Sequence, residues 1–260
     1  MSFDVSADAY GRFMGRYSEP LAAGFVELTG LSPGQRALDV GCGPGALTAQ
    51  LVRILGPQAV AALDPSPSFV AAVRARLPGV DAREGRAEQL PFADDSFDAA
   101  AAQLVVHFLS DPVVGLREMA RVVRPGGIVA ACVWDHAGGG GPLSAFWAAA
   151  RELDPGVEDE ADRPGAREGH LVELSHAAGL PDVEASTVSV RAHFATFDDW
   201  WVPFTLGVGP AGAHVARLDE PDRAALRERC ERRLPDAPFD IVAAAWCVRA
   251  RVGRAGADSA

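Results

Sequence analysis

The order of apolar and polar positions divides residues 36–134 into short strands that alternate with longer helices. Short continuous apolar runs, which are typical of buried strands, are separated by segments in which apolar residues recur at helical spacing. We expect five strands, at residues 37–40, 59–63, 80–84, 97–102 and 128–134. Because strands that alternate with helices require right-handed crossovers, the pattern predicts a parallel sheet with helices on both faces.

Outside this region the pattern is weaker. Residues 1–35 contain an apolar helical run and are predicted to form an N-terminal helical lid, the alternative being a helix that only packs on the sheet with its arginines solvated. Residues 183–196 and 239–252 read as two further strands. Residues 137–168 and 197–234 are expected as insertions that form a cap, and residues 253–260 as a flexible tail. The acidic segment 158–162 is interpreted as a solvated loop.

Composition narrows the classes of partner. The chain has 260 residues, 48% of them apolar, and a formal net charge of -11, with only 24 lysines and arginines. Since nucleic-acid binding needs a basic face, we expect no nucleic-acid partner. No run approaches the roughly 18 apolar residues of a membrane span, and no signal region is seen, so we predict a cytoplasmic protein without membrane insertion. The oligomeric state, monomer or homodimer, stays open.

A glycine-rich turn follows the first predicted strand. Gly41, Gly43 and Gly45 lie between this strand and a helix that begins near Ala46. Glycine suits a tight strand-to-helix turn and lets a ligand approach the backbone, while the helix N-terminus offers unpaired N–H groups. The turn therefore predicts a nucleotide-binding site.

Two acidic residues distinguish the classes of nucleotide. Asp64 ends the second strand at about the ~20-residue spacing of an acid that binds ribose, although an aspartate that only caps a helix fits as well. Asp39 precedes the first glycine by two positions. A carboxylate there disfavours a pyrophosphate and suits a ligand that carries an ammonium group.

The motif Asp39-Val-Gly-Cys-Gly-Pro-Gly45, together with Asp64 and Arg124-Pro-Gly-Gly127, resembles the class I S-adenosylmethionine-dependent methyltransferases over about 100 residues. The likeness is to the small-molecule type 11 branch of ubiquinone and menaquinone biosynthesis. It implies an α/β fold of the Rossmann-like, doubly wound kind within residues 36–252, mostly parallel with an antiparallel edge strand and a small helical cap. The last two strands would pair antiparallel at that edge.

The resemblance also implies the ligands. S-adenosylmethionine would be the cofactor, S-adenosylhomocysteine its product, and a small apolar molecule the acceptor, methylated at O, N or C. The expected cofactor residues are Asp39, Gly41, Cys42, Gly43, Gly45, Asp64, Pro65, Ala87, Glu88, Gln103, Tyr10 and Arg16, with Tyr17 as a further candidate from the lid.

Three positions depart from the patterns of related families. Where an aspartate usually binds the adenine amino group, this chain has Arg86, which leaves the Ala87 N–H and the Glu88 side chain as adenine contacts. Catechol-type relatives hold a metal with an acid where this chain has Gln103, so we expect no metal. The amino-group motif of nucleic-acid and protein methyltransferases is replaced by Gln103-Leu-Val-Val106, which favours a small-molecule acceptor.

Catalysis and acceptor binding are predicted from pattern alone. Because the sulfonium arrives activated, a general base is optional. His107, just past the fourth strand, is the best-placed base, and His136 after the fifth strand is the second. An aromatic-lined acceptor pocket is expected from His136, Trp147, Trp200, Trp201 and Phe204, the alternative being that the tryptophans only pack the cap.

Two other functions remain open on the sequence. A nicotinamide-dependent oxidoreductase would use the same glycine turn, although Asp39 counts against it. A protein of the methyltransferase fold that uses S-adenosylmethionine structurally would need the same intact cofactor site.

Overall fold

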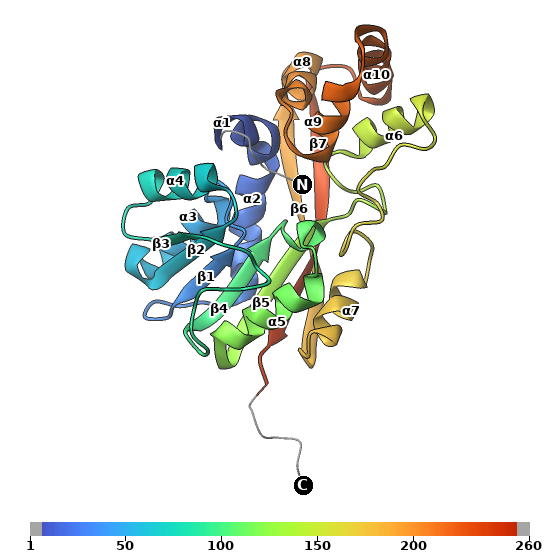
Figure 1. Ribbon diagram of the computed structural model, residues 1–260. Coiled ribbons are helices and arrows are strands. Elements are labelled where there is room, and N and C mark those ends of the chain that lie inside the picture. The colour runs from blue at the N-terminus through green and yellow to red at the C-terminus, as the bar shows by residue number, and fades with distance from the viewer. Residues whose placement is uncertain (1–6, 254–260) are drawn as a thin grey trace.

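The computed structural model describes residues 7–253, so residues 1–6 of the predicted lid and 254–260 of the predicted tail lie outside the described residues. Within the described range, seven strands form one sheet in the order β3-β2-β1-β4-β5-β7-β6 (Figure 1). The strands are β1 (Ala37–Val40), β2 (Val60–Asp64), β3 (Asp81–Glu84), β4 (Phe97–Gln103), β5 (Val123–Trp134), β6 (Asp182–Phe194) and β7 (Phe239–Arg251).

The direction of the strands confirms the predicted fold class. β1 to β5 are parallel, and β7 pairs antiparallel with both β5 and β6. The reversed strand is thus β7, second from the edge, and β6 at the edge runs with the parallel set. Since β6 points the same way as β5, both strands end at the carboxyl edge of the sheet, where ligands of doubly wound folds bind.

Helices cover both faces of the sheet. Their bounds are α1 (Ala7–Tyr10), α2 (Arg16–Phe25), α3 (Ala46–Leu55), α4 (Pro67–Arg76), α5 (Pro112–Val122), α6 (Ser144–Leu153), α7 (His170–Ala177), α8 (Phe197–Trp201), α9 (Gly209–Arg217) and α10 (Glu220–Arg233). A π-helical turn, Gly11–Gly15, joins α1 to α2. Buried side chains of α2, α3 and α4 form one apolar cluster with the sheet, and those of α5 and α7 form the other.

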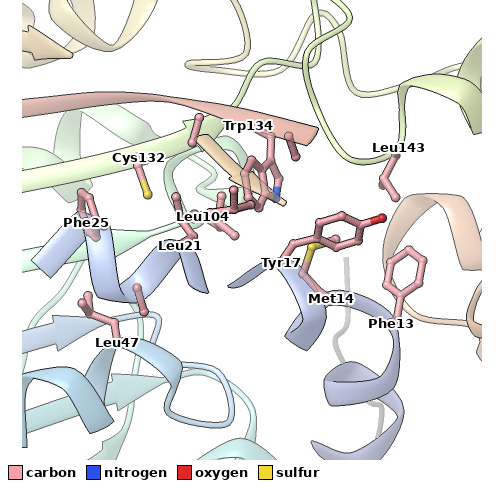
Figure 2. Packing of buried hydrophobic residues seen from close by; sticks show 14 of the residues in the cluster. Phe13, Met14, Tyr17, Leu21, Phe25, Leu47, Leu104, Cys132, Trp134 and Leu143 are labelled. Atoms are coloured by element: carbon pink, nitrogen blue, oxygen red, sulfur yellow. The ribbon is translucent and has the colours of Figure 1, made fainter. Parts of the chain in front are cut away.

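Successive side chains of β1 point to opposite faces of the sheet and so reach both helical layers. Leu38 and Val40 belong to the α5 side, whereas Ala37 belongs to the α3 side, and Asp39 meets Thr48 of α3. On the α3 side, Leu21 and Phe25 of α2 are fully buried in the cluster that also holds Leu104 and Trp134 (Figure 2). The polar Asp39 is therefore enclosed by an otherwise apolar layer.

The two insertions predicted at 137–168 and 197–234 leave the sheet at its carboxyl edge. They carry α6 and α8 to α10, which gather together at the top of Figure 1. α6 packs against α10, and Glu152 of α6 forms ion pairs with Arg229 and Arg233 of α10. Segments that are far apart in sequence thus build a single cap beside the ends of β4 and β5.

Candidate functional site

The glycine turn has a backbone that only glycine tolerates at its first position. Gly41 has φ +70°, and a Cβ there would lie 2.5 Å from Cγ2 of Val105. The N–H groups of Gly41 and Cys42 both donate to the Leu63 carbonyl, which holds the turn against β2. Gly43 also has a positive φ, and a Cβ there would meet nothing within 4 Å. The turn is therefore fixed by its neighbours and open on one side.

Asp39 is an enclosed carboxyl group with one unpartnered oxygen. Its side chain is 1% exposed, Oδ2 accepts a 2.6 Å hydrogen bond from the Thr48 hydroxyl, and Oδ1 has no partner within the described range. Burial, and to a smaller extent the charge of Asp64, raise the pKa of Asp39 to about 7 against the lowering effect of the Thr48 hydrogen bond. No residue in the described part of the chain forms a salt bridge with Asp39.

Asp64 ties the turn to the second strand. Oδ2 accepts a hydrogen bond of 2.9 Å from the Gly43 N–H, and Oδ1 accepts one of 2.8 Å from the Ser66 N–H. Burial raises the pKa of Asp64. Ser66 is itself the N-cap residue of α4, so this bond holds the turn before the helix and does not satisfy an N–H group of the helix. Asp64 also lines the adjacent cavity.

A cavity of about 170 Å³ opens beside the turn. Eight of the predicted cofactor residues line it, namely Tyr10, Gly41, Gly43, Asp64, Pro65, Ala87, Glu88 and Gln103. Asp39 and Cys42 line a small pocket next to it, which shares Tyr10 and Gln103. Gly45, at φ +97°, shapes the start of α3. Gln103 donates to the Ser18 carbonyl and so fastens α2 to the end of β4.

Two lid candidates lie elsewhere. The Arg16 guanidinium lies over the ring of Phe194 and donates to the His193 carbonyl, both on β6. Tyr17 packs between Trp134 and Phe194. The structure does not bring either side chain to the cavity, because α2 presents them to the far strands. Tyr10 is thus the lid residue at the site.

Sequence reasoning missed the apolar wall of this cavity. The additional lining residues are Leu63, Phe69, Arg86, Leu104, Val105, Phe108 and Leu109. Phe69 meets Tyr10 edge-on at 5.4 Å between ring centroids. Leu104 has φ +60°, a conformation that non-glycine residues adopt at a cost and that clusters at functional sites. Its position directly after β4 was the available signal.

A second, narrower cavity of about 40 Å³ adjoins the first and shares Tyr10, Leu104 and Phe108 with it. Its other lining residues are Phe13, Met14, His107, Trp134, His136, Leu143, Glu160, Val208, Gly209 and Pro210. Both histidines singled out by sequence therefore face the same space. The apolar remainder comes from the lid, the strand ends and the cap.

Burial makes these histidines weak bases. His107 is 4% exposed, and burial lowers its pKa well below the ordinary value. Burial also lowers the pKa of His136 to about 4. Both imidazoles are therefore neutral at pH 7, and neither has the pKa near the working pH that favours general-base catalysis.

Glu160 corrects the interpretation of the acidic loop. It is 2% exposed, and Oε2 accepts a 3.1 Å hydrogen bond from Nε1 of Trp147. Burial raises the pKa of Glu160 to about 7. The loop was expected to be solvated because charge runs usually are, but the packing of α6 encloses this one carboxyl group at the second cavity.

The structure does not bring four residues of the predicted aromatic lining to the second cavity. Trp147, Trp200, Trp201 and Phe204 are all buried, and none lines the second cavity. Phe204 instead stacks on Phe146 at 4.6 Å and 5°, and the cluster extends to Phe13. These rings join the insertions to the apolar cluster that covers the α2 side of the sheet. His136 is the one residue of that predicted set that lines the cavity.

The family match and two sequence relatives are all named as methyltransferases. Residues 38–131 match a family described as a methyltransferase domain. An uncharacterized methyltransferase of Mycobacterium tuberculosis (strain ATCC 25618 / H37Rv) is 40% identical over 128 residues, which is 49% of each chain. A demethylmenaquinone methyltransferase of Mycobacterium sp. (strain KMS) is 43% identical over 104 residues, 40% of this chain and 43% of that one. The alignments thus span less than half the length of these relatives.

Solved structures extend the likeness of fold over most of the chain. A geranyl diphosphate methyltransferase in complex with S-adenosylmethionine superposes with a TM-score of 0.53 at 15% identity, covering 92% of this chain and 86% of that one. The [4+2]-cyclase SpnF superposes with a TM-score of 0.55 at 22% identity, covering 91% and 82%. No helix among residues 7–253 has the length and apolar character needed to cross a membrane.

Proposed function

Because residues 38–131 match a family described as a methyltransferase domain, we propose that the protein transfers the methyl group of S-adenosylmethionine to O, N or C of a small, largely apolar acceptor. The observation that carries the proposal is the pair of buried carboxyl groups at the ends of two neighbouring parallel strands. Asp39 keeps an unpartnered oxygen, and Asp64 lines the main cavity. Two acids without a cationic partner suit a ligand that brings positive charge and hydroxyl groups.

The donor set fits this cofactor better than a dinucleotide. An ammonium group near Oδ1 of Asp39 would satisfy an oxygen that is otherwise buried without a partner. Ribose hydroxyls would donate to Asp64, and the Ala87 N–H and the Glu88 side chain remain the proposed adenine contacts. A pyrophosphate would instead face two acids at close range, which is unfavourable. The same geometry therefore argues against the oxidoreductase alternative.

The cofactor, when bound, supplies an activated methyl group, so the chain has to align the reactants and exclude water. Tyr10, Leu104 and Phe108 belong to both cavities and would therefore stand where cofactor and acceptor meet. The second cavity is walled mainly by apolar side chains, which supports an apolar acceptor. Since it measures about 40 Å³, an acceptor larger than a few water molecules requires the cap or lid to open.

Calorimetry with S-adenosylmethionine, S-adenosylhomocysteine and NADH in parallel tests the cofactor. We expect binding of the first two and not of NADH, and weaker binding in Asp64→Ala. Asp111→Ala is a matched control, because Asp111 also bonds a backbone N–H, that of Val114, at a helix start but lies outside the lining residues. Binding of NADH alone would support the oxidoreductase.

The likeness to a [4+2]-cyclase at 22% identity concerns the fold alone and leaves a second function to be tested. A protein that uses the cofactor structurally would bind S-adenosylmethionine without consuming it. Incubation with candidate acceptors separates the two cases, since S-adenosylhomocysteine accumulates only when methyl is transferred. Acceptor turnover without S-adenosylhomocysteine would favour the structural use.

A further inference from the structure

Three side chains that sequence reasoning treated separately converge at the second cavity. His107 follows β4 in a short helical turn, Val106–Phe108, His136 follows β5, and Glu160 belongs to the insertion that precedes α7. One nitrogen of each histidine and one carboxylate oxygen of Glu160 all lie within 4.8 Å of one another. Because β4 and β5 are parallel neighbours, their carboxyl ends place the two imidazoles 5.7 Å apart between ring centroids.

The two histidines have unsatisfied polar atoms. Nδ1 of His107 and Nε2 of His136 are buried and have no hydrogen-bond partner among residues 7–253, and the His107 side chain is 4% exposed. Buried polar groups are nearly always satisfied, so each unpartnered atom calls for a physical reason. A ligand that accepts the lone pair of a neutral imidazole supplies one.

We propose that His107, His136 and Glu160 form a binding site for a divalent transition-metal ion at the second cavity. Two imidazoles and one carboxylate are the donor set of many zinc and iron(II) sites that keep open positions. Tetrahedral ligands at about 2.1 Å from zinc lie about 3.4 Å apart, so the widest pair has to close by at most about 1.4 Å. The cavity of about 40 Å³ has room for an ion and a water molecule.

The surroundings support a cation. Trp147 donates to Oε2 of Glu160, the kind of hydrogen bond that orients a ligating carboxylate. The acids Asp135 and Asp159 also act on His136 electrostatically. The opposing charge is Arg163, whose guanidinium lies over the Phe108 ring and donates to the His107 carbonyl. Arg163 is not among the residues that line the cavity.

This site changes two expectations from sequence. The absence of an acid at Gln103 predicted no metal, but the proposed ligands come from other positions. A histidine nitrogen that binds a metal has no lone pair left for a proton, so the predicted role of His107 as general base is replaced. The metal site does not depend on which cofactor the first cavity binds.

Titration with Co²⁺, followed by its visible absorption and by calorimetry, tests the site. We expect one Co²⁺ per wild-type chain, displaced by Zn²⁺. Glu160→Gln and His136→Ala should each weaken binding about 100-fold or more, and Trp147→Phe about 10-fold, since it removes only the supporting hydrogen bond. His193→Ala is the matched control, because His193 is an exposed histidine that pairs with Asp240 on β7. It should leave Co²⁺ binding unchanged.

Two outcomes would overturn the site: wild-type protein that binds no Co²⁺, or binding that survives both Glu160→Gln and His136→Ala. S-adenosylmethionine affinity and circular dichroism, measured on the same samples, show whether each variant is folded. Glu160→Gln keeps the shape of the side chain and its acceptor oxygen for Trp147, so it serves if His136→Ala fails to fold. Wild-type protein that binds the cofactor but no metal overturns this inference alone.

Discussion

Asp64 accepts a 2.9 Å hydrogen bond from the backbone N–H of Gly43, 21 residues earlier in the chain. This bond links the end of β2 to the glycine turn after β1, and Asp64 holds Ser66 with its other oxygen. The carboxylate therefore positions the loops on both sides of the proposed cofactor site. A substitution there is expected to affect both the cofactor and the fold.

Asp64→Ala should weaken S-adenosylmethionine binding by about 10- to 100-fold, because a hydrogen bond to a charged group contributes about 1.5–3 kcal/mol. It should also lower the free energy of unfolding, since two backbone N–H groups lose their acceptor. Asp64→Asn keeps one acceptor oxygen and should recover part of the stability. Calorimetry and urea unfolding measure the two effects, and unchanged affinity in Asp64→Ala would leave Asp64 only the role of holding the two loops in place.

Asp39 should make cofactor binding pH-dependent. Burial holds its pKa near 7, so below pH 7 the carboxyl is mostly protonated. A bound ammonium group favours the carboxylate and lowers that pKa, so binding should release a proton, and affinity should rise with pH from about 5 to about 7 and then level off.

Calorimetry at pH 6 in two buffers of different ionisation enthalpy measures the released proton. Asp39→Asn cannot release one, so its binding heat should not depend on the buffer, and its affinity should be lower and flat over this pH range. A wild-type binding heat that is the same in both buffers would exclude an ammonium partner for Asp39.

Gly41→Ala should destabilise the protein more than an ordinary glycine substitution. Alanine at φ +70° costs about 1–2 kcal/mol, and the contact of 2.5 Å with Val105 adds about 1–3 kcal/mol of overpacking. Gly207→Ala is the matched control, because Gly207 lies in the left-handed region with φ +73° and has no atom within 4 Å of the added Cβ. Urea unfolding compares the free energies of unfolding of the two variants. Equal losses of stability would mean that the Val105 side chain moves aside without a cost in free energy.

Phe204→Leu should reduce stability and leave cofactor binding unchanged. The ring is buried and stacks on Phe146, so losing it should cost about 1–3 kcal/mol. Phe108→Leu is the comparison, because Phe108 lines both cavities and should alter ligand binding. If Phe204→Leu changed S-adenosylmethionine affinity at unchanged stability, the cap core would have a direct part in the site.

The features predicted well from sequence are those set by neighbouring residues. The strand-turn-helix of residues 37–55 follows from a buried apolar run, three glycines and helical spacing, and the structure has each element in place. β7 could be recognised as a strand from its sequence, but its place between β5 and β6 depends on long-range pairing. The family resemblance implied that the last two strands pair antiparallel, but it did not give their order in the sheet.

The second cavity could not be predicted because its members come from distant segments. Glu160 has no local signal, since its enclosure depends on Trp147 packing in the cap. Trp200 and Phe204 are aromatic residues that could line a pocket or fill a core, and only tertiary packing decides which of the two they do. Residues 16 and 17 of α2 illustrate the same limit, as helix rotation turns both toward β6 and away from the glycine turn.

The direction of β6 has a consequence for how this molecule can vary. Since β5 and β6 both end at the carboxyl edge, each can be followed by an insertion of any length that returns to the sheet without disturbing strand register. The glycine turn, Asp39 and Asp64 all lie outside the two inserts, so a change in an insert need not alter them. Because α6 and α10 are joined through Glu152, a change in one insert is expected to need a matching change in the other.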